Sequence, residues 1–119
     1  MSFRFAAAAV AALSVLVVLA VPTRALAHES RDVGKYQMVV GFIVEPAYEG
    51  QKNGLDLRVR IPGTPATPVL GLEKTLQVEI SFVGNDAKVT KPVRAISAAN
   101  DPGHYTADVL PTQSGQYRF

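Results

Sequence analysis

The sequence predicts an all-β antiparallel sandwich that follows an N-terminal secretion signal. Three observations carry this prediction: an apolar leader with a cleavage motif, short runs in which apolar and polar residues alternate, and turns rich in Pro and Gly between those runs. Outside the leader, no window places apolar residues at helical spacing. We therefore expect strands and turns throughout the exported part of the chain.

The leader occupies residues 1–27. Arg4 precedes an apolar run from Phe5 to Val21, and Pro22 then breaks any helix. Ala25-Leu26-Ala27 supplies the small residues that signal peptidase requires, so cleavage is expected after Ala27. His28 would then be the first mature residue. An uncleaved anchor is the alternative, but the run is at the short limit for crossing a bilayer.

Charge and cysteine content narrow the function classes. Two of the 12 basic residues, Arg4 and Arg24, lie in the leader, so the remaining chain has equal numbers of basic and acidic residues. A neutral domain lacks the main electrostatic support for binding nucleic acid, and no nucleic-acid partner is expected. The chain has no cysteine, so an exported domain must fold on hydrophobic burial without disulfides. Residues 28–35 are expected to form a mature N-terminal segment, and 36–119 the sandwich domain.

In five segments, apolar and polar residues alternate as they do in β-strands. Residues 36–44 are apolar on both faces, which predicts a central strand, whereas the next two have one polar face each. Asn53-Gly54 is expected to be a turn, and the Pro-rich stretch 62–71 an irregular loop that crosses between sheets. Pro92 makes its segment an edge strand. The predicted strands are 36–44, 55–61, 76–82, 88–95 and 105–109, with a sixth beginning at 116–119.

Two turns share one pattern, a Tyr two residues after a Gly: Gly103 with Tyr105, and Gly115 with Tyr117. The glycine permits a left-handed corner, and the tyrosine hydroxyl can bond back to the backbone, as in tyrosine corners. Because Phe119 falls inside an apparent strand, we expect the sandwich to lack its closing strand within this sequence.

Three stretches carry a family resemblance: AHESRDVGKYQMVVGFIVEPAYEGQKNGLDLRV, PVLGLEKTLQVEISF and DPGHYTADVLPTQSGQYRF. Together they resemble exported bacterial immunoglobulin-like domains akin to the YtkA-like and CopC-like proteins. The resemblance implies an immunoglobulin-like β-sandwich outside the cytoplasm, and in longer relatives a C-terminal membrane segment. For CopC-like proteins it also implies copper binding through a mature N-terminal histidine, and His28 is the matching position.

A metal site at His28 also has a chemical basis. An N-terminal histidine offers its amine and a ring nitrogen, and Cu(II) prefers nitrogen donors in a tetragonal arrangement. His104, the other histidine, could add a third nitrogen. The candidate oxygen ligands are Glu29, Asp32, Asp101 and Asp108.

Enzymatic interpretations find less support. No serine lies in a G-x-S-x-G elbow, and the chain has no phosphate loop, HExxH or dinucleotide fingerprint. Glu45 and Glu49 could form a carboxylate pair, but their neighbours indicate a turn. Tyr48 between them is one candidate binding surface, and Arg58 and Arg60, with Asp56 on the solvated face of their strand, are another.

We therefore expect a periplasmic, secreted or envelope-exposed binding or accessory module without catalytic activity. Its partner would be a protein or another envelope component, and its only membrane contact the signal peptide or an unseen C-terminal anchor. The alternative is a periplasmic protein that binds copper or another transition metal through His28 and His104.

Overall fold

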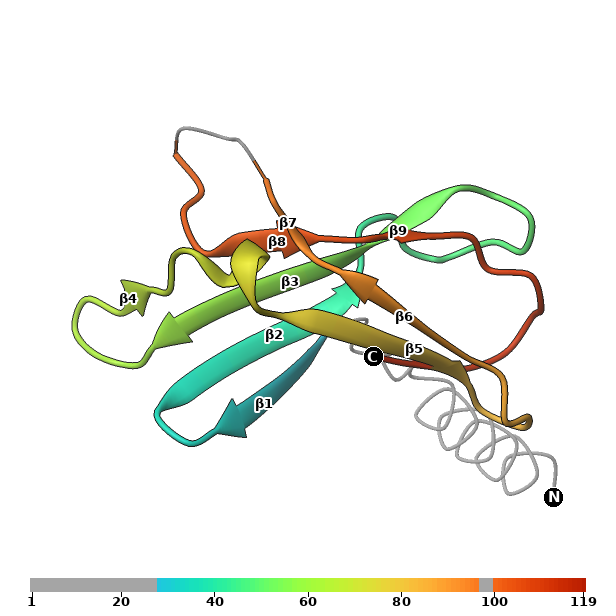
Figure 1. Cartoon of the computed structure of the whole chain (residues 1–119), viewed down its shortest axis with the longest axis horizontal. Coiled ribbons are helices and arrows are strands. Elements are labelled where there is room, and N and C mark those ends of the chain that lie inside the picture. Colours follow the sequence, from blue (N-terminus) through green and yellow to red (C-terminus); the bar gives the residue numbers. More distant parts are fainter. Residues whose placement is uncertain (1–27, 97–99) are drawn as a thin grey trace, which may run out of the picture.

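The computed structural model describes residues 28–96 and 100–119, which form two antiparallel sheets packed as a sandwich (Figure 1). The all-β sandwich expected from the sequence is confirmed. The predicted signal peptide, residues 1–27, lies outside the described residues. In the part of the chain that the structure describes, no helix is long and apolar enough to cross a membrane.

The larger sheet carries the N-terminal half of the domain and has the strand order β1-β2-β3-β8-β7, with β4 and β9 also pairing with β3. The central strand β3 therefore has neighbours on both sides along most of its length. The strands are β1 (Glu29–Val33), β2 (Tyr36–Phe42), β3 (Asn53–Ile61), β4 (Thr67–Pro68), β7 (Arg94–Ala95), β8 (His104–Thr106) and β9 (Asp108–Val109).

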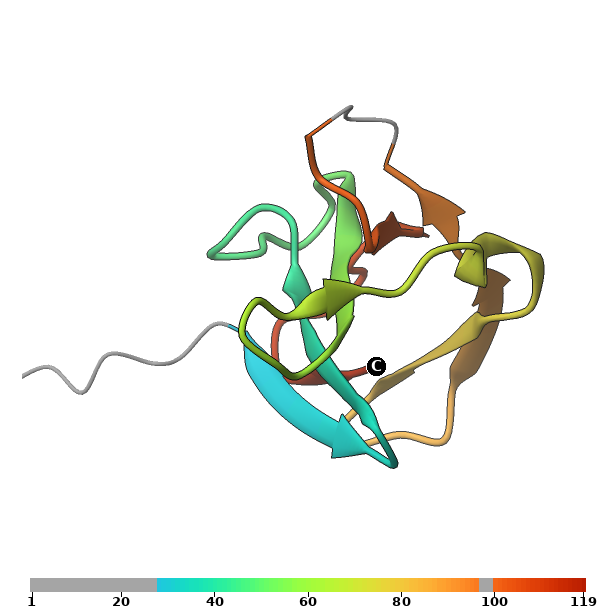
Figure 2. The ribbon, with the colours of Figure 1, turned by 90° about the vertical axis from the view of Figure 1, so that its left-hand side faces the viewer.

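The smaller sheet has the order β10-β5-β6 and faces the first across the core (Figure 2). A short 3-10 turn, η1 (Leu72–Lys74), precedes its central strand on the crossing from the larger sheet. The three strands are β5 (Gln77–Phe82), β6 (Lys88–Pro92) and β10 (Tyr117–Arg118).

Alternation along β3 explains how the core and the outer face are divided. Leu55, Leu57 and Val59 are buried between the sheets, whereas Asp56 and Arg58 occupy the opposite face. Each buried aliphatic side chain stabilises the fold by roughly 1.5–3 kcal/mol relative to exposure. The full core consists of Val40, Leu55, Leu57, Val59, Val78, Ile80, Val93, Tyr105, Ala107 and Val109.

Pro92 marks the point at which one predicted strand divides between the two sheets. Residues 88–92 form β6 at the edge of the smaller sheet, and after buried Val93 the chain continues as β7 at the edge of the larger one. Both pieces are edge strands, as expected from a proline that cannot donate to a ladder.

Three local expectations are corrected. Asn53-Gly54 is not a turn, because both residues lie in β3 and pair with β9. The Asn53 side chain instead bonds to the backbone N and O of Val44 at 3.0 and 2.9 Å. Within the Pro-rich stretch, Thr67–Pro68 forms β4 against the end of β3. Finally, β1 was not anticipated, since its residues show no clear alternation.

The two tyrosines that follow glycines do bond back to the backbone. The Tyr117 hydroxyl donates to Gln113 O at 3.0 Å and accepts from the amides of Thr112 and Gln113 at 3.1 Å. The buried Tyr105 hydroxyl donates to Val69 O at 2.6 Å and accepts from Leu72 N at 3.3 Å. Tyr105 thus ties β8 to the crossing segment, while Tyr117 closes its own turn.

Candidate functional site

Two histidines meet at one carboxylate on the outer face of the larger sheet. His28 Nε2 lies 3.1 Å from Asp56 Oδ2, and His104 Nε2 lies 2.6 Å from Asp56 Oδ1. We call these three residues the His–Asp cluster. Glu45 flanks it at His28, where Oε2 lies 3.5 Å from Nδ1, and Asp101 flanks it at His104, where Oδ2 lies 2.6 Å from Nδ1.

The register of β1, β2 and β3 brings His28 to Asp56. Glu29 pairs with Val40, so the preceding residue, His28, falls opposite Gly41, and Gly41 pairs with Asp56. Paired residues of antiparallel strands point to the same face. Because Gly41 has no side chain, the His28 ring can reach across β2 to the carboxylate on β3.

His104 approaches from the other side of β3. It pairs with Arg58, which lies two residues after Asp56 on the same face, so the ring meets Asp56 diagonally. Its backbone is fixed on the far side as well, since Ile96 N donates to His104 O at 2.9 Å. The ring is largely enclosed, with 11% of the side chain exposed.

The turn before His104 depends on Gly103. Its φ of 77° lies in the left-handed region, and its carbonyl accepts a bond from Val59 N at 2.9 Å. A Cβ at this position would lie 2.8 Å from Val59 O and 2.9 Å from Pro68 Cβ. The glycine therefore lets the turn sit close against β3 and β4, which sets the position of His104.

The His104 ring contacts two carboxylates, but a neutral imidazole can donate a hydrogen bond to only one of them. Both ring nitrogens lie 2.6 Å from carboxylate oxygens, of Asp101 and Asp56. A neutral imidazole has one N–H, and an ionised carboxylate only accepts. The second contact therefore requires a further proton, either on the ring or on the Asp56 carboxyl.

Asp101 also pairs with an arginine. Its Oδ1 accepts from Arg58 Nη1 at 2.5 Å, while its Oδ2 faces His104. The Arg58 hydrogen bond, followed by the one from His104, holds the pKa of the Asp101 carboxyl below its ordinary value of 3.8. Asp101 is therefore an ionised partner of both residues at neutral pH.

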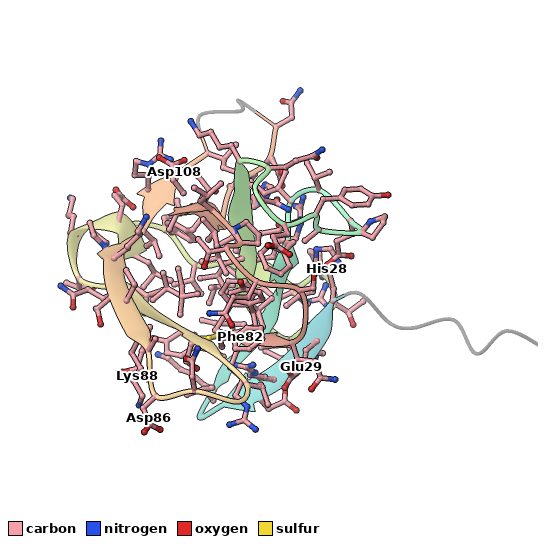
Figure 3. All side chains as sticks on the ribbon, turned by 90° about the vertical axis from the view of Figure 1, so that its right-hand side faces the viewer. His28, Glu29, Phe82, Asp86, Lys88 and Asp108 are labelled. Carbon is pink, nitrogen blue, oxygen red and sulfur yellow. The ribbon has the colours of Figure 1, made fainter. Side chains whose placement is uncertain are left out.

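The structure separates the candidate ligands named from the sequence. His28 and His104 come together, and Asp101 lies behind His104. Glu29 pairs with Arg31 at 2.9 Å on the surface, and Asp32 is exposed on β1. Asp108 pairs with Arg94 at 2.9 Å, well away from His28 (Figure 3).

Sequence reasoning missed Asp56 and Glu45 as members of this site. Asp56 was interpreted only as a residue of a solvated strand face, and Glu45 as part of a turn. In the structure, their side chains are 19% and 21% exposed and each contacts His28. One feature of the sequence points to Asp56. It is an acidic residue on the polar face of its strand, and the strand before it in the chain contains a glycine, Gly41.

The donor set of the His–Asp cluster fits a transition metal in its chemistry. Two imidazoles and a carboxylate are ligands of Cu(II) and Zn(II), and Asp101 on His104 Nδ1 is the usual outer partner of a metal-bound imidazole. Among the residues that the structure describes, however, no three His, Cys, Asp or Glu side chains already surround a common metal position. The rings instead contact Asp56 directly, so a metal would have to separate them.

The other candidate surfaces lie apart from these contacts. Tyr48 is 56% exposed, and Glu49 accepts from the Ser114 hydroxyl at 2.8 Å. Arg60 donates to Gln37 at 2.7 Å on the outer sheet face. A cleft of about 860 Å³ opens between the sheets and is lined by inner-face residues such as Leu57 and Phe82, with no residue of the His–Asp cluster.

No family model, curated protein or solved structure matches the chain. The likeness to YtkA-like and CopC-like domains therefore stays a prediction from the sequence.

Proposed function

We propose that this protein is an extracytoplasmic, non-enzymatic sandwich module that binds Cu(II). The ligands would be the His28 amine and ring, a ring nitrogen of His104 and the Asp56 carboxylate. The observation that supports this most directly is the meeting of the only two histidines of the chain at one carboxylate.

The arrangement of charges around the cluster favours a cation. Three carboxylates, those of Asp56, Glu45 and Asp101, lie within 3.5 Å of a histidine nitrogen. Arg58 is the permanent positive charge that lies next to them. A divalent ion between the rings and Asp56 would replace the protons that those contacts otherwise need. Nitrogen donors with one carboxylate oxygen suit Cu(II) over Mg(II) or Ca(II), which prefer oxygen ligands.

The free amine is the part of this proposal that depends on export. Signal cleavage after Ala27 would expose it beside the His28 ring, giving two nitrogens from one residue. The amine would chelate together with Nδ1, which here lies 3.5 Å from Glu45 Oε2 while Nε2 faces Asp56, so the His28 ring has to turn over to bring this chelate to Asp56. Copper bound in this way would be stored or carried.

The test uses the exported protein. The chain with its predicted leader is expressed in a host that exports proteins, and mass spectrometry establishes whether the mature protein begins at His28. Cu(II) affinity is then measured by competition with a chelator. We expect submicromolar binding with one ion per chain, and an electron paramagnetic resonance spectrum with nitrogen coupling.

The matched control inserts one alanine between Ala27 and His28, which moves the free amine away but keeps both rings. We expect this variant to bind Cu(II) at least about tenfold more weakly, or about 1.4 kcal/mol. Equal affinity in the two proteins would remove the amine from the site. Absence of Cu(II) binding in a protein that begins at His28 would contradict the proposal itself.

A second candidate is a protein-binding module in which the His–Asp cluster is only a structural tie between β1, β3 and β8. The exposed Tyr48 loop, next to Glu45, favours this candidate as a docking surface. It predicts that His28→Ala lowers stability without any associated loss of metal binding.

A further inference from the structure

A chain of charged contacts continues behind the His–Asp cluster. His104 Nδ1 lies 2.6 Å from Asp101 Oδ2, and the other oxygen of Asp101 accepts from Arg58 at 2.5 Å. Arg58 Nε also lies 3.9 Å from Asp56 Oδ1. One arginine thus stands between the two carboxylates that contact the His104 ring.

We infer that Asp101, held by Arg58, is a positioning residue that keeps a proton on His104 Nδ1 and so directs a metal to Nε2. This inference rests on the proposed metal-binding function. It assigns Asp101 a role different from the ligand role suggested by the sequence.

Both oxygens of Asp101 are already engaged, which argues against metal ligation by this carboxylate. Oδ1 is bonded to Arg58 and Oδ2 to His104. Releasing either contact would leave Arg58 or His104 with one fewer hydrogen bond.

The orientation of the ring also selects the nitrogen. Nε2 faces Asp56, and Asp56 also contacts the ring of His28. Nδ1 faces away, toward the turn that begins at Asp101. A proton held at Nδ1 leaves the Nε2 lone pair available on the side where the other donors lie.

The experiment compares three variants of the exported protein: Asp101→Ala, Arg58→Gln and the control Asp108→Asn. The control removes the charge of a similar surface Arg–Asp pair, Arg94 with Asp108 at 2.9 Å, which lies outside the cluster. Cu(II) affinity is measured by chelator competition. Zn(II) serves as a diamagnetic probe, and nitrogen-15 spectra of the His104 ring report which nitrogen carries a proton.

We expect Asp101→Ala to weaken Cu(II) binding by about 10- to 100-fold, as is typical for an outer partner of a metal ligand. Arg58→Gln should weaken it less, because Asp101 stays next to the ring, and the control should bind as the wild type does. With Zn(II), the wild-type ring should be protonated at Nδ1 and ligated at Nε2. In Asp101→Ala, the Nδ1 proton signal should be lost to exchange or the two nitrogens should share ligation.

Wild-type affinity and unchanged Nε2 ligation in Asp101→Ala would overturn the inference, as would ligation at Nδ1 in the wild type. Should Asp101→Ala fail to fold, Asp101→Asn replaces it, since the amide keeps the shape but loses the charge. Failure of the proposed function can be told apart from failure of this inference. If neither metal binds, spectra of the metal-free proteins still show whether Asp101 holds the Nδ1 proton. Loss of the Nδ1 proton signal in Asp101→Ala would mean that the Asp101 contact holds it.

Discussion

His104 Nε2 lies 2.6 Å from Asp56 Oδ1, although 48 positions separate the two residues along the chain. The contact exists because β3 and β8 pair antiparallel with Arg58 opposite His104. It links the two halves of the larger sheet on its outer face, while Leu57 and Tyr105 pair on the inner face. One strand pair therefore contributes both to the core and to the candidate metal site.

Asp56→Ala should affect metal binding and stability together. The substitution removes the one group that both histidine rings contact, and loss of hydrogen bonds to a charged group costs about 1–3 kcal/mol. We expect a lower urea midpoint and no high-affinity Cu(II) binding. Asp32→Ala, on the exposed face of β1, is the control and should change neither measurement. Normal Cu(II) affinity in Asp56→Ala would show that Asp56 is not a ligand.

Gly41→Val should separate His28 from Asp56. A valine at this position would place its side chain between the two residues, while its own strand preference supports β2. We expect Cu(II) affinity to fall at least about tenfold, or about 1.4 kcal/mol. The control is Gln37→Val, on the same face of β2 but opposite Arg60. Equal losses in both variants would mean that the effect is not local to the cluster.

The strands were largely predictable from the sequence, and the site only in part. The alternation of apolar and polar residues predicts β2, β3 and β5, because each of these strands buries the side chains of one face against the opposite sheet. The N-terminal strand β1 was missed because it lies at a sheet edge with mostly exposed side chains, so its residues have no buried face to reveal a period. His28 was identified by its place after the cleavage motif.

Asp56 could not be paired with the histidines because its role depends on register. A shift of one residue between β2 and β3 would turn Asp56 to the other face, and nothing in a single sequence sets the pairing of distant strands. Likewise, Asp101 lies three residues before His104, but only the left-handed turn at Gly103 directs its carboxylate to the ring.

Gly103→Ala should be strongly destabilising. Its φ of 77° is unfavourable for alanine, and the added Cβ would come within 2.8 Å of the Val59 carbonyl oxygen. We expect a loss of more than about 2 kcal/mol in unfolding free energy. Gly34→Ala shares a positive φ, 59°, but its Cβ meets no atom within 4 Å, so only the backbone strain of about 1–2 kcal/mol remains. Urea unfolding of both proteins measures the difference, and equal losses would exclude a packing role for Gly103.

Tyr105→Phe should weaken the connection between β8 and the crossing segment. The hydroxyl bonds to Val69 O and Leu72 N inside the protein, so its removal leaves a carbonyl and an amide without this partner. We expect a loss of about 1–3 kcal/mol in the free energy of unfolding. Tyr48→Phe removes a hydroxyl from a side chain that is 56% exposed and should be neutral. A neutral Tyr105→Phe would mean that water replaces the hydroxyl.

The Arg58–Asp101 pair should stabilise the protein in a pH-dependent way. The pKa of Asp101 is lowered in the folded state, so its contribution is fully present well above the ordinary value of 3.8 and is lost as the pH falls through the folded pKa. Arg58 keeps its charge throughout this range.

We therefore expect the wild type to be more stable than Asp101→Asn at neutral pH. The difference in urea midpoint should stay constant down to about one unit above 3.8 and shrink below it, because the unfolded carboxyl then binds a proton before the folded one does. The Asp108→Asn control removes a similar Arg–Asp pair on the surface, in which Asp108 lies 2.9 Å from Arg94. A wild-type advantage over Asp101→Asn that persists unchanged at about pH 2 would be incompatible with stabilisation by an ionised Asp101, since protonation in both states removes that charge.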